Sequence, residues 1–130
     1  MSNLVLVDSS FWIRMVKVRR DPFALITAQS DDFDFAINGV IWAEVVRGRT
    51  DPHLRARFDE FFGTLRFLDL AQAGWQDATR LAWELGRRGE VIPLTDIIIA
   101  ATAMIHGAAL LTFDRHFQAI PGLVVVDDLG

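Results

Sequence analysis

Four carboxylates in this 130-residue chain stand where a charge needs an explanation. Asp8 follows the apolar run of residues 3–7, and Asp114 follows a second short apolar run. Asp96 lies at the start of an apolar helical pattern. Glu44 lies within another such pattern, among apolar neighbours, where a carboxylate is costly unless it is paired or bound to a metal. These four acids are therefore the first candidates for a reactive site.

Each acid also has a simpler local explanation. A carboxylate that precedes a helix accepts hydrogen bonds from free backbone N–H groups, which would account for Asp8. The same capping role is the preferred interpretation of Asp96 when it is taken alone. Glu44 would be neutralised by an ion pair with Arg14 or Arg47. A functional interpretation depends on whether the fold brings the acids together.

The apolar pattern predicts strands that alternate with helices. Strands are expected at residues 3–7, 35–37, 65–70, 109–112 and 123–126. Helices are expected at residues 11–18, 22–29, 39–47, 52–62 and 72–86, with a last one from about residue 95. The helix at 72–86 should turn Trp75, Leu81, Ala82 and Leu85 inward. This alternation is typical of a three-layer α/β/α domain with a short parallel central sheet, and 1–130 is the length of one domain.

A doubly wound sheet brings the ends of successive strands to one edge, where ligands bind. Acids gathered there would repel one another unless a cation lay between them. Mg²⁺ or Mn²⁺ prefers oxygen ligands and activates water for attack on a phosphodiester. Ser10 and Thr112 are close enough in sequence to the acids to hold them or to contact a phosphate, and turn stabilisation would also explain both.

Composition excludes several other chemistries. The chain has no cysteine, so it has no disulfide or thiolate metal site, and it has no glycine-rich phosphate loop. A receiver-like phosphoacceptor domain would need an acidic pair after the first strand and a lysine after the last, whereas Lys17 is the only lysine. The net charge of −4 argues against a nucleic-acid partner. If four of the 17 acids bind a cation, however, 13 acids remain beside 13 Lys and Arg, and the rest of the surface is neutral.

Four segments of the chain together resemble one family. They are VDSSFW around Asp8, WAEVVRG around Glu44, RRGEVIPLTDIIIAATA around Asp96 and LLTFDRHF around Asp114. In their order and spacing they resemble PIN-domain proteins of the VapC kind, the ribonuclease toxins of type II toxin–antitoxin pairs. The resemblance extends over nearly the whole chain.

The resemblance implies a metal-dependent endoribonuclease whose acidic site is Asp8, Glu44, Asp96 and Asp114. Of these, Asp8, Asp96 and Asp114 are the expected ligands of Mg²⁺ or Mn²⁺. Ser10, Thr112 and His116 are expected beside them, as groups that contact the substrate or hold the acids. Many relatives have a further acid where this chain has His116. The resemblance therefore does not extend to the binding of a second metal at that position.

The resemblance also implies partners: RNA as substrate, a small antitoxin that covers the active-site groove, and a second copy in a homodimer. The hydrophobic content of 52% is in keeping with a covered surface. Two alternatives remain, an RNA-processing PIN nuclease outside a toxin–antitoxin pair and a catalytically inert interaction module. The apolar run near the start is too short for a signal segment or a membrane span, so a cytoplasmic protein is expected.

Overall fold

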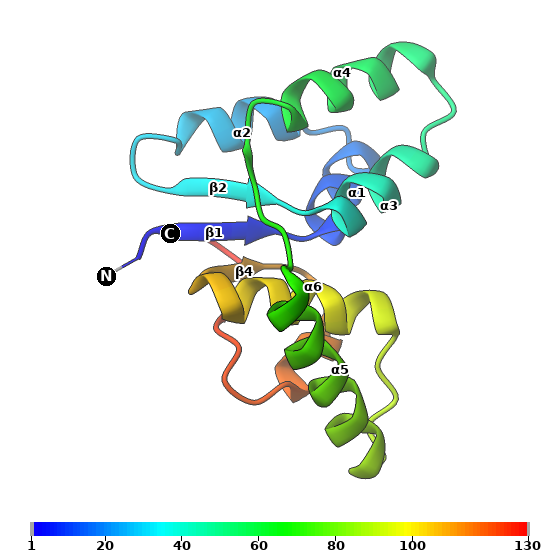
Figure 1. The fold of residues 1–130 in the computed structure, drawn as a ribbon. Coiled ribbons are helices and arrows are strands. Elements are labelled where there is room, and N and C mark those ends of the chain that lie inside the picture. The colour runs from blue at the N-terminus through cyan, green and yellow to red at the C-terminus, as the bar shows by residue number, and fades with distance from the viewer. Residues whose placement is uncertain (1, 130) are drawn as a thin grey trace.

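A computed structural model describes residues 2–129, and a five-stranded parallel sheet forms its centre (Figure 1). The strands are Leu4–Val7 (β1), Asp34–Ile37 (β2), Arg66–Phe67 (β3), Ala109–Leu111 (β4) and Val125–Val126 (β5). The helices are Ser9–Lys17 (α1), Pro22–Ala28 (α2), Gly39–Arg47 (α3), Pro52–Phe62 (α4), Gln72–Arg87 (α5) and Leu94–His106 (α6). A 3₁₀ helix, η1, spans Arg115–Ala119. The predicted α/β class with a parallel sheet is confirmed.

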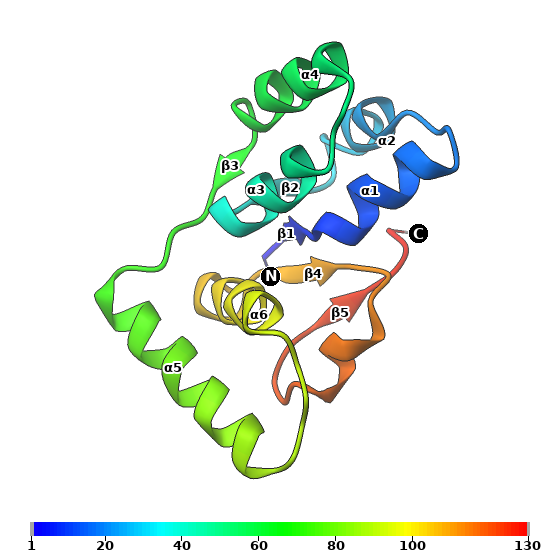
Figure 2. The same cartoon turned by 90° about the vertical axis from the view of Figure 1, so that its right-hand side faces the viewer.

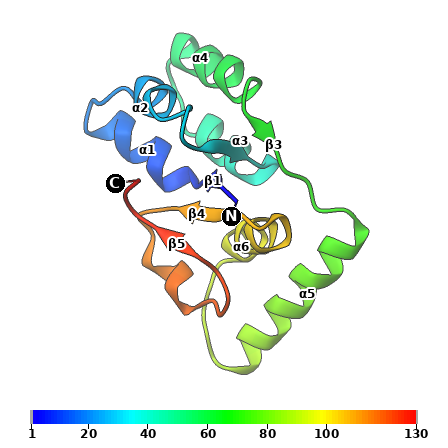
Figure 3. The ribbon, with the colours of Figure 1, turned by 90° about the vertical axis from the view of Figure 1, so that its left-hand side faces the viewer.

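The strands are arranged in the order β3-β2-β1-β4-β5, with β1 paired to both β2 and β4. Helices α1, α2 and α4 lie on one side of this sheet, and α5 and α6 lie on the other (Figures 2 and 3). The structure thus has three layers. Because β1 is central and covered on both faces, Val5, Leu6 and Val7 are all buried, which is why residues 3–7 read as a continuous apolar run.

Aromatic side chains fill the space between the sheet and the helices α1, α2 and α4. Trp12 is fully buried, and its ring centroid lies 5.0 Å from that of Phe62 in an edge-to-face contact. Phe23 of α2 packs on Phe58 of α4 with a centroid separation of 4.9 Å. These contacts fix α1, and therefore the loop before it, against the rest of the domain.

Helix starts follow the capping residues in the sequence. Asn38 accepts a hydrogen bond from the Ile41 N–H at 2.9 Å and begins α3 as predicted. Asp51 accepts from the His53 N–H at 2.9 Å, and Pro52 occupies the first turn of α4.

The structure differs from the sequence-based expectations in three respects. Trp75 of α5 does not face inward, since 49% of it is exposed. The buried face of α5 runs through Gly74, Ala78 and Leu85 instead, and a Cβ on Gly74 would lie only 3.0 Å from the Leu70 side chain. Strands β3 and β5 are shorter than predicted. The 3₁₀ helix η1 was not foreseen.

Because the strands run parallel, their carboxyl ends lie at one edge of the sheet. Strands β1, β2 and β4 point the same way, and α1 and α3 begin directly beyond the ends of β1 and β2 (Figure 1). Asp8, Asn38 and Thr112 are the residues that immediately follow these three strands. The carboxyl edge of the sheet is therefore where polar side chains from distant segments meet.

Candidate active site

Asp8 lies at the middle of the carboxyl edge and is only 2% exposed. It is the N-cap of α1, and its Oδ2 atom accepts a hydrogen bond of 3.3 Å from the Ser10 N–H. The same oxygen accepts from the Thr112 hydroxyl at 2.8 Å. The capping explanation for Asp8 is therefore right, and Thr112 adds a contact that a cap alone would not need.

Hydroxyl groups connect the end of β1 to the end of β4. The single proton of Thr112 goes to Asp8, so the 3.1 Å contact between Thr112 and Ser10 is a hydrogen bond donated by Ser10. Thr112 Oγ1 also accepts from the Asp114 N–H at 3.0 Å, and Ser10 Oγ accepts from the Phe113 N–H at 3.0 Å. Thr112 thus contacts Asp8 through its hydroxyl and Ser10 contacts it through its backbone N–H, and a role for either residue in the reaction stays a prediction.

Glu44 reaches the same edge from α3. Its Oε1 accepts a 3.2 Å hydrogen bond from the hydroxyl of Ser9, which also lies 3.5 Å from Asp8 Oδ1. The pKa of the Glu44 carboxyl is raised, and burial is the largest cause. The Ser9 hydrogen bond and the charge of Arg47 lower this pKa, whereas repulsion from Asp8 and Asp96 raises it. Within residues 2–129, neither predicted arginine forms an ion pair with Glu44.

Ser9 is a site residue that sequence reasoning missed. Its hydroxyl lies between two carboxylates and has one proton, so it donates to one of them at a time, at the shorter distance to Glu44. Its position directly after Asp8 was the only signal in the sequence.

Asp96 is not a helix cap, which corrects the interpretation preferred from sequence alone. Helix α6 begins one turn earlier, with Pro93 at the N-cap and no side-chain hydrogen bond there. Asp96 lies in the first turn with 13% of its side chain exposed. Burial raises the pKa of its carboxyl, repulsion from Asp114 and Asp8 raises it further, and His116 partly offsets both effects.

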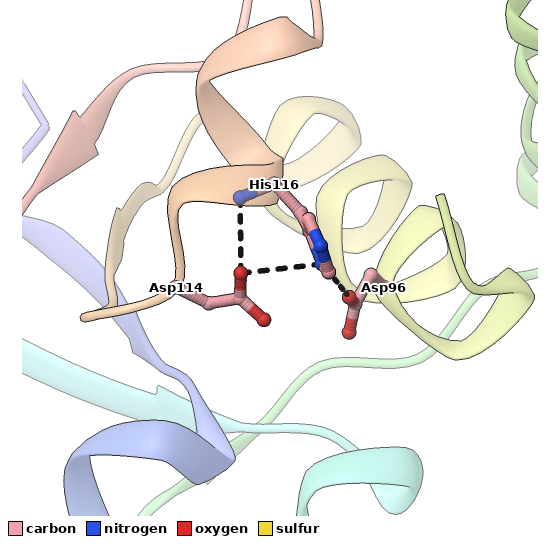
Figure 4. A group of neighbouring side chains, drawn as sticks. All are labelled: Asp96, Asp114 and His116. Carbon is pink, nitrogen blue, oxygen red and sulfur yellow. Dashed lines mark hydrogen bonds and ion pairs between the residues drawn. The ribbon is translucent and has the colours of Figure 1, made fainter. Parts of the chain in front are cut away.

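Asp114 caps η1 and meets Asp96 through His116 (Figure 4). Asp114 Oδ1 accepts from the backbone N–H of His116 at 2.9 Å. The His116 Nδ1 atom lies 3.3 Å from Asp114 Oδ1 and 3.5 Å from Asp96 Oδ2. The imidazole therefore lies between carboxylates that belong to α6 and to the end of β4.

The four predicted acids lie near the same edge of the sheet. Repulsion from Asp8 and Asp96 raises the pKa of Glu44, and repulsion from Asp114 and Asp8 raises that of Asp96, so these repulsive pairs connect all four acids. One ligand atom from each of Asp96, Asp114 and His116 lies within 4.8 Å of the others. An oxygen-rich, mutually repelling set of this kind fits a hard divalent cation, which relieves the repulsion. Which of them take part in catalysis stays a prediction.

Comparison with known proteins agrees with this architecture. Among solved structures, VapBC2 of Rickettsia felis bound to promoter DNA has a TM-score of 0.79 at 20% identity, covering 95% of this chain and 97% of that one. A toxin–antitoxin complex of Klebsiella pneumoniae has a TM-score of 0.67 at 27% identity, covering 94% and 95%. VapC20 of Mycobacterium tuberculosis, a toxin that cleaves the sarcin–ricin loop, has a TM-score of 0.68 at 16% identity, covering 92% and 96%.

At such identities the likeness to the Rickettsia and Mycobacterium proteins establishes the fold. A search of curated proteins finds no match. The model of the PIN domain family matches residues 5–123, which contain all four acids, the two hydroxyls and His116. The chain therefore belongs to the PIN domain family.

Proposed function

We propose that this protein is a divalent-metal-dependent endoribonuclease and the toxin of a type II toxin–antitoxin pair. One observation supports the proposal above others: four carboxylates from β1, α3, α6 and the end of β4 converge at one sheet edge of a PIN domain. An inert interaction module would have no use for this arrangement, because clustered acids destabilise the fold that holds them. The whole chain, 1–130, is proposed to form one nuclease domain.

Asp8, Asp96 and Asp114 would hold the cation. A bound Mg²⁺ or Mn²⁺ would neutralise charge on the scissile phosphate and lower the pKa of an attacking water. Thr112 and the Ser10 N–H fix Asp8 Oδ2, so the Oδ1 atom is the one available to face the site. Glu44, which is not among the proposed ligands, would accept a proton, since its raised pKa makes it a stronger base than an ordinary glutamate.

The proposed partners are RNA, a small antitoxin and a second copy of the chain. The solved structures from Rickettsia felis and Klebsiella pneumoniae are complexes that contain an antitoxin. Several large apolar side chains of α5, of the segment after it and of the first residue of α6 are exposed here, and they would suit a covering partner: Trp75, Trp83, Val91 and Leu94. No helix among residues 2–129 combines the length and apolar character needed to cross a bilayer. A cytoplasmic location forms part of the proposal.

Cleavage of labelled RNA by purified protein, with and without Mg²⁺ or Mn²⁺, tests the activity. Asp96→Asn should lower the rate at least about a hundredfold, as loss of a metal ligand or of charge stabilisation typically does. Asp51→Asn is the matched control, because Asp51 is an exposed cap of α4 and asparagine caps nearly as well. Full activity of Asp96→Asn would refute the assignment.

Expression in growing cells separates a toxin from an RNA-processing enzyme. The parent should arrest growth, Asp96→Asn should not, and co-expression of the antitoxin should relieve the arrest. Normal growth despite soluble, RNA-cleaving protein would favour the processing nuclease.

A further inference from the structure

His116 occupies a fixed position at the edge of the acidic cluster. The next residue, Phe117, is fully buried and anchors η1. The His116 backbone N–H donates to Asp114 Oδ1 at 2.9 Å, so the cap that starts η1 also ties residue 116 to a site carboxylate. Although 54% of the His116 side chain is exposed, the backbone that carries it is held on two sides.

The imidazole lies beside the carboxylates of Asp114 and Asp96 (Figure 4). Its Nδ1 atom lies 3.3 Å from Asp114 Oδ1 and 3.5 Å from Asp96 Oδ2. Two atoms bound to one cation at about 2.1 Å are separated by about 3.0 Å when they subtend a right angle. The two separations exceed that value by about 0.3 and 0.5 Å, and the ligand atoms of all three residues lie within 4.8 Å of one another, so one cation would reach all three atoms after side-chain adjustments.

The chemistry of this set differs from that of an all-carboxylate site. Mg²⁺ binds oxygen almost exclusively, whereas imidazole nitrogen suits transition metals, whose affinity for N/O ligands rises along the first row. Exchanging a carboxylate for a neutral nitrogen therefore weakens Mg²⁺ binding more than Mn²⁺ binding.

We propose that His116 is a direct nitrogen ligand of the cation held by Asp96 and Asp114, and that it sets the preference of the site for Mn²⁺ over Mg²⁺. This inference rests on the metal site of the proposed function and goes beyond it, because that function needs only the carboxylates. His116 then replaces an oxygen ligand rather than acting as a positive charge beside the metal.

Pulsed electron paramagnetic resonance of Mn²⁺ bound to the full-length protein tests the ligand directly. Mn²⁺ coordinated by imidazole shows coupling to the ¹⁴N nucleus, and a site of oxygen atoms alone does not. The coupling should be present in the parent, absent in His116→Gln, and present in His53→Gln. His53 is the matched control because it is an exposed histidine in the first turn of α4.

The preference is measured as the ratio of the Mg²⁺ and Mn²⁺ dissociation constants by calorimetry. His116→Asp restores an all-oxygen set and should lower this ratio about tenfold relative to the parent, a change of the size that altered metal surroundings produce. Circular dichroism and the melting temperature in chelator show that each variant is folded. An unchanged ratio would overturn the inference about preference.

The outcomes separate this inference from the proposed function. Tight Mn²⁺ binding without nitrogen coupling would refute His116 as a ligand and leave the carboxylate site intact. Nitrogen coupling in a protein that does not cleave RNA would support the ligand and refute the nuclease. Failure of the parent to bind Mn²⁺ would refute both the metal site and the ligand.

Discussion

The Thr112 hydroxyl donates a 2.8 Å hydrogen bond to Asp8 Oδ2 and so joins the ends of two neighbouring parallel strands. The pairing of Val7 with Leu111 brings the two residues that follow, Asp8 and Thr112, to the same level of the sheet. The orientation of the most buried acid thus depends on strand register as well as on its own helix. Any loss of this register would move the carboxylate away from the other three.

We expect Thr112→Val to lower both stability and activity, because Asp8, Ser10 and the Asp114 N–H would each lose a buried partner. Leaving such groups unpaired typically costs about 1–3 kcal/mol in the free energy of unfolding. Thr112→Ser keeps the hydroxyl and loses only a methyl group, worth roughly 0.8 kcal/mol. Urea denaturation and RNA cleavage of both variants provide the measurement. A valine variant as stable and active as the serine variant would contradict this role.

Ser9→Ala should raise the pKa of Glu44 further. The Ser9 hydroxyl donates to Glu44 and favours its charged form, so its removal leaves burial and the repulsion from Asp8 and Asp96 less opposed. Carbon-detected NMR titration of the metal-free protein follows the Glu44 carboxyl directly. Ser30→Ala is the control, since the Ser30 hydroxyl bonds only to the nearby Thr27 carbonyl among the contacts described. A Glu44 pKa unchanged by Ser9→Ala would show that the hydroxyl does not control it.

The sequence predicted those features that depend on local chemistry. Asn38, and Asp51 with Pro52, mark helix starts that the structure reproduces, because each cap acts on N–H groups two or three residues away. The meeting of Asp8 and Thr112 was also predictable, since parallel strands bring their carboxyl ends to one edge.

Features that depend on packing between distant segments were not predictable. Asp96 resembled a cap because nothing in the sequence shows that α6 starts at Leu94 and that His116 would contact it. Trp75 resembled a core residue, but α5 packs through Gly74, whose missing side chain allows close approach to Leu70 and Ile105. In both cases a neighbouring element decided the outcome.

The purified chain alone is expected to be a homodimer, because apolar side chains of this size are rarely left uncovered. Phe58 is fully buried in the core and so lies outside any such surface. Trp75 is exposed and is a candidate for it. Light scattering at tens of micromolar decides the matter, and a monomer mass would refute the expectation.

As the pH falls from 7.5 toward 4, the metal-free protein should become more stable relative to a variant in which Glu44 and Asp96 are replaced by their neutral amides. The folded-state pKa values of Glu44 and Asp96 are raised above their ordinary values of 4.5 and 3.8. At a pH between the unfolded-state and folded-state pKa values, the native state binds more protons than the unfolded chain. The free energy of unfolding therefore increases as the pH falls. The added stability is complete below the unfolded values and absent above the folded ones.

The test compares two proteins rather than one profile, so that the titration of all other carboxylates is common to both. Urea midpoints of the parent and of the double variant Glu44→Gln/Asp96→Asn, both stripped of metal, are measured across the pH range. The difference between them should shrink as the pH falls. A difference independent of pH would contradict the raised pKa values.

Asp96→Asn should melt at a higher temperature than the parent in chelator at pH 7.5. Burial and repulsion from Asp114 and Asp8 outweigh the attraction of His116, since the net effect raises the Asp96 pKa, and a neutral side chain of the same shape avoids the cost of the charge. The lost interaction with the helix dipole, roughly 0.3–1 kcal/mol, acts in the opposite direction and is the smaller effect. Asp51→Asn should change the melting temperature little.

Added Mn²⁺ should then raise the melting temperature of the parent above that of Asp96→Asn, because a ligand at a hundred times its dissociation constant stabilises the native state by about 2.7 kcal/mol. If Asp96→Asn melts lower in chelator and Mn²⁺ shifts both proteins equally, Asp96 belongs to no shared cation site.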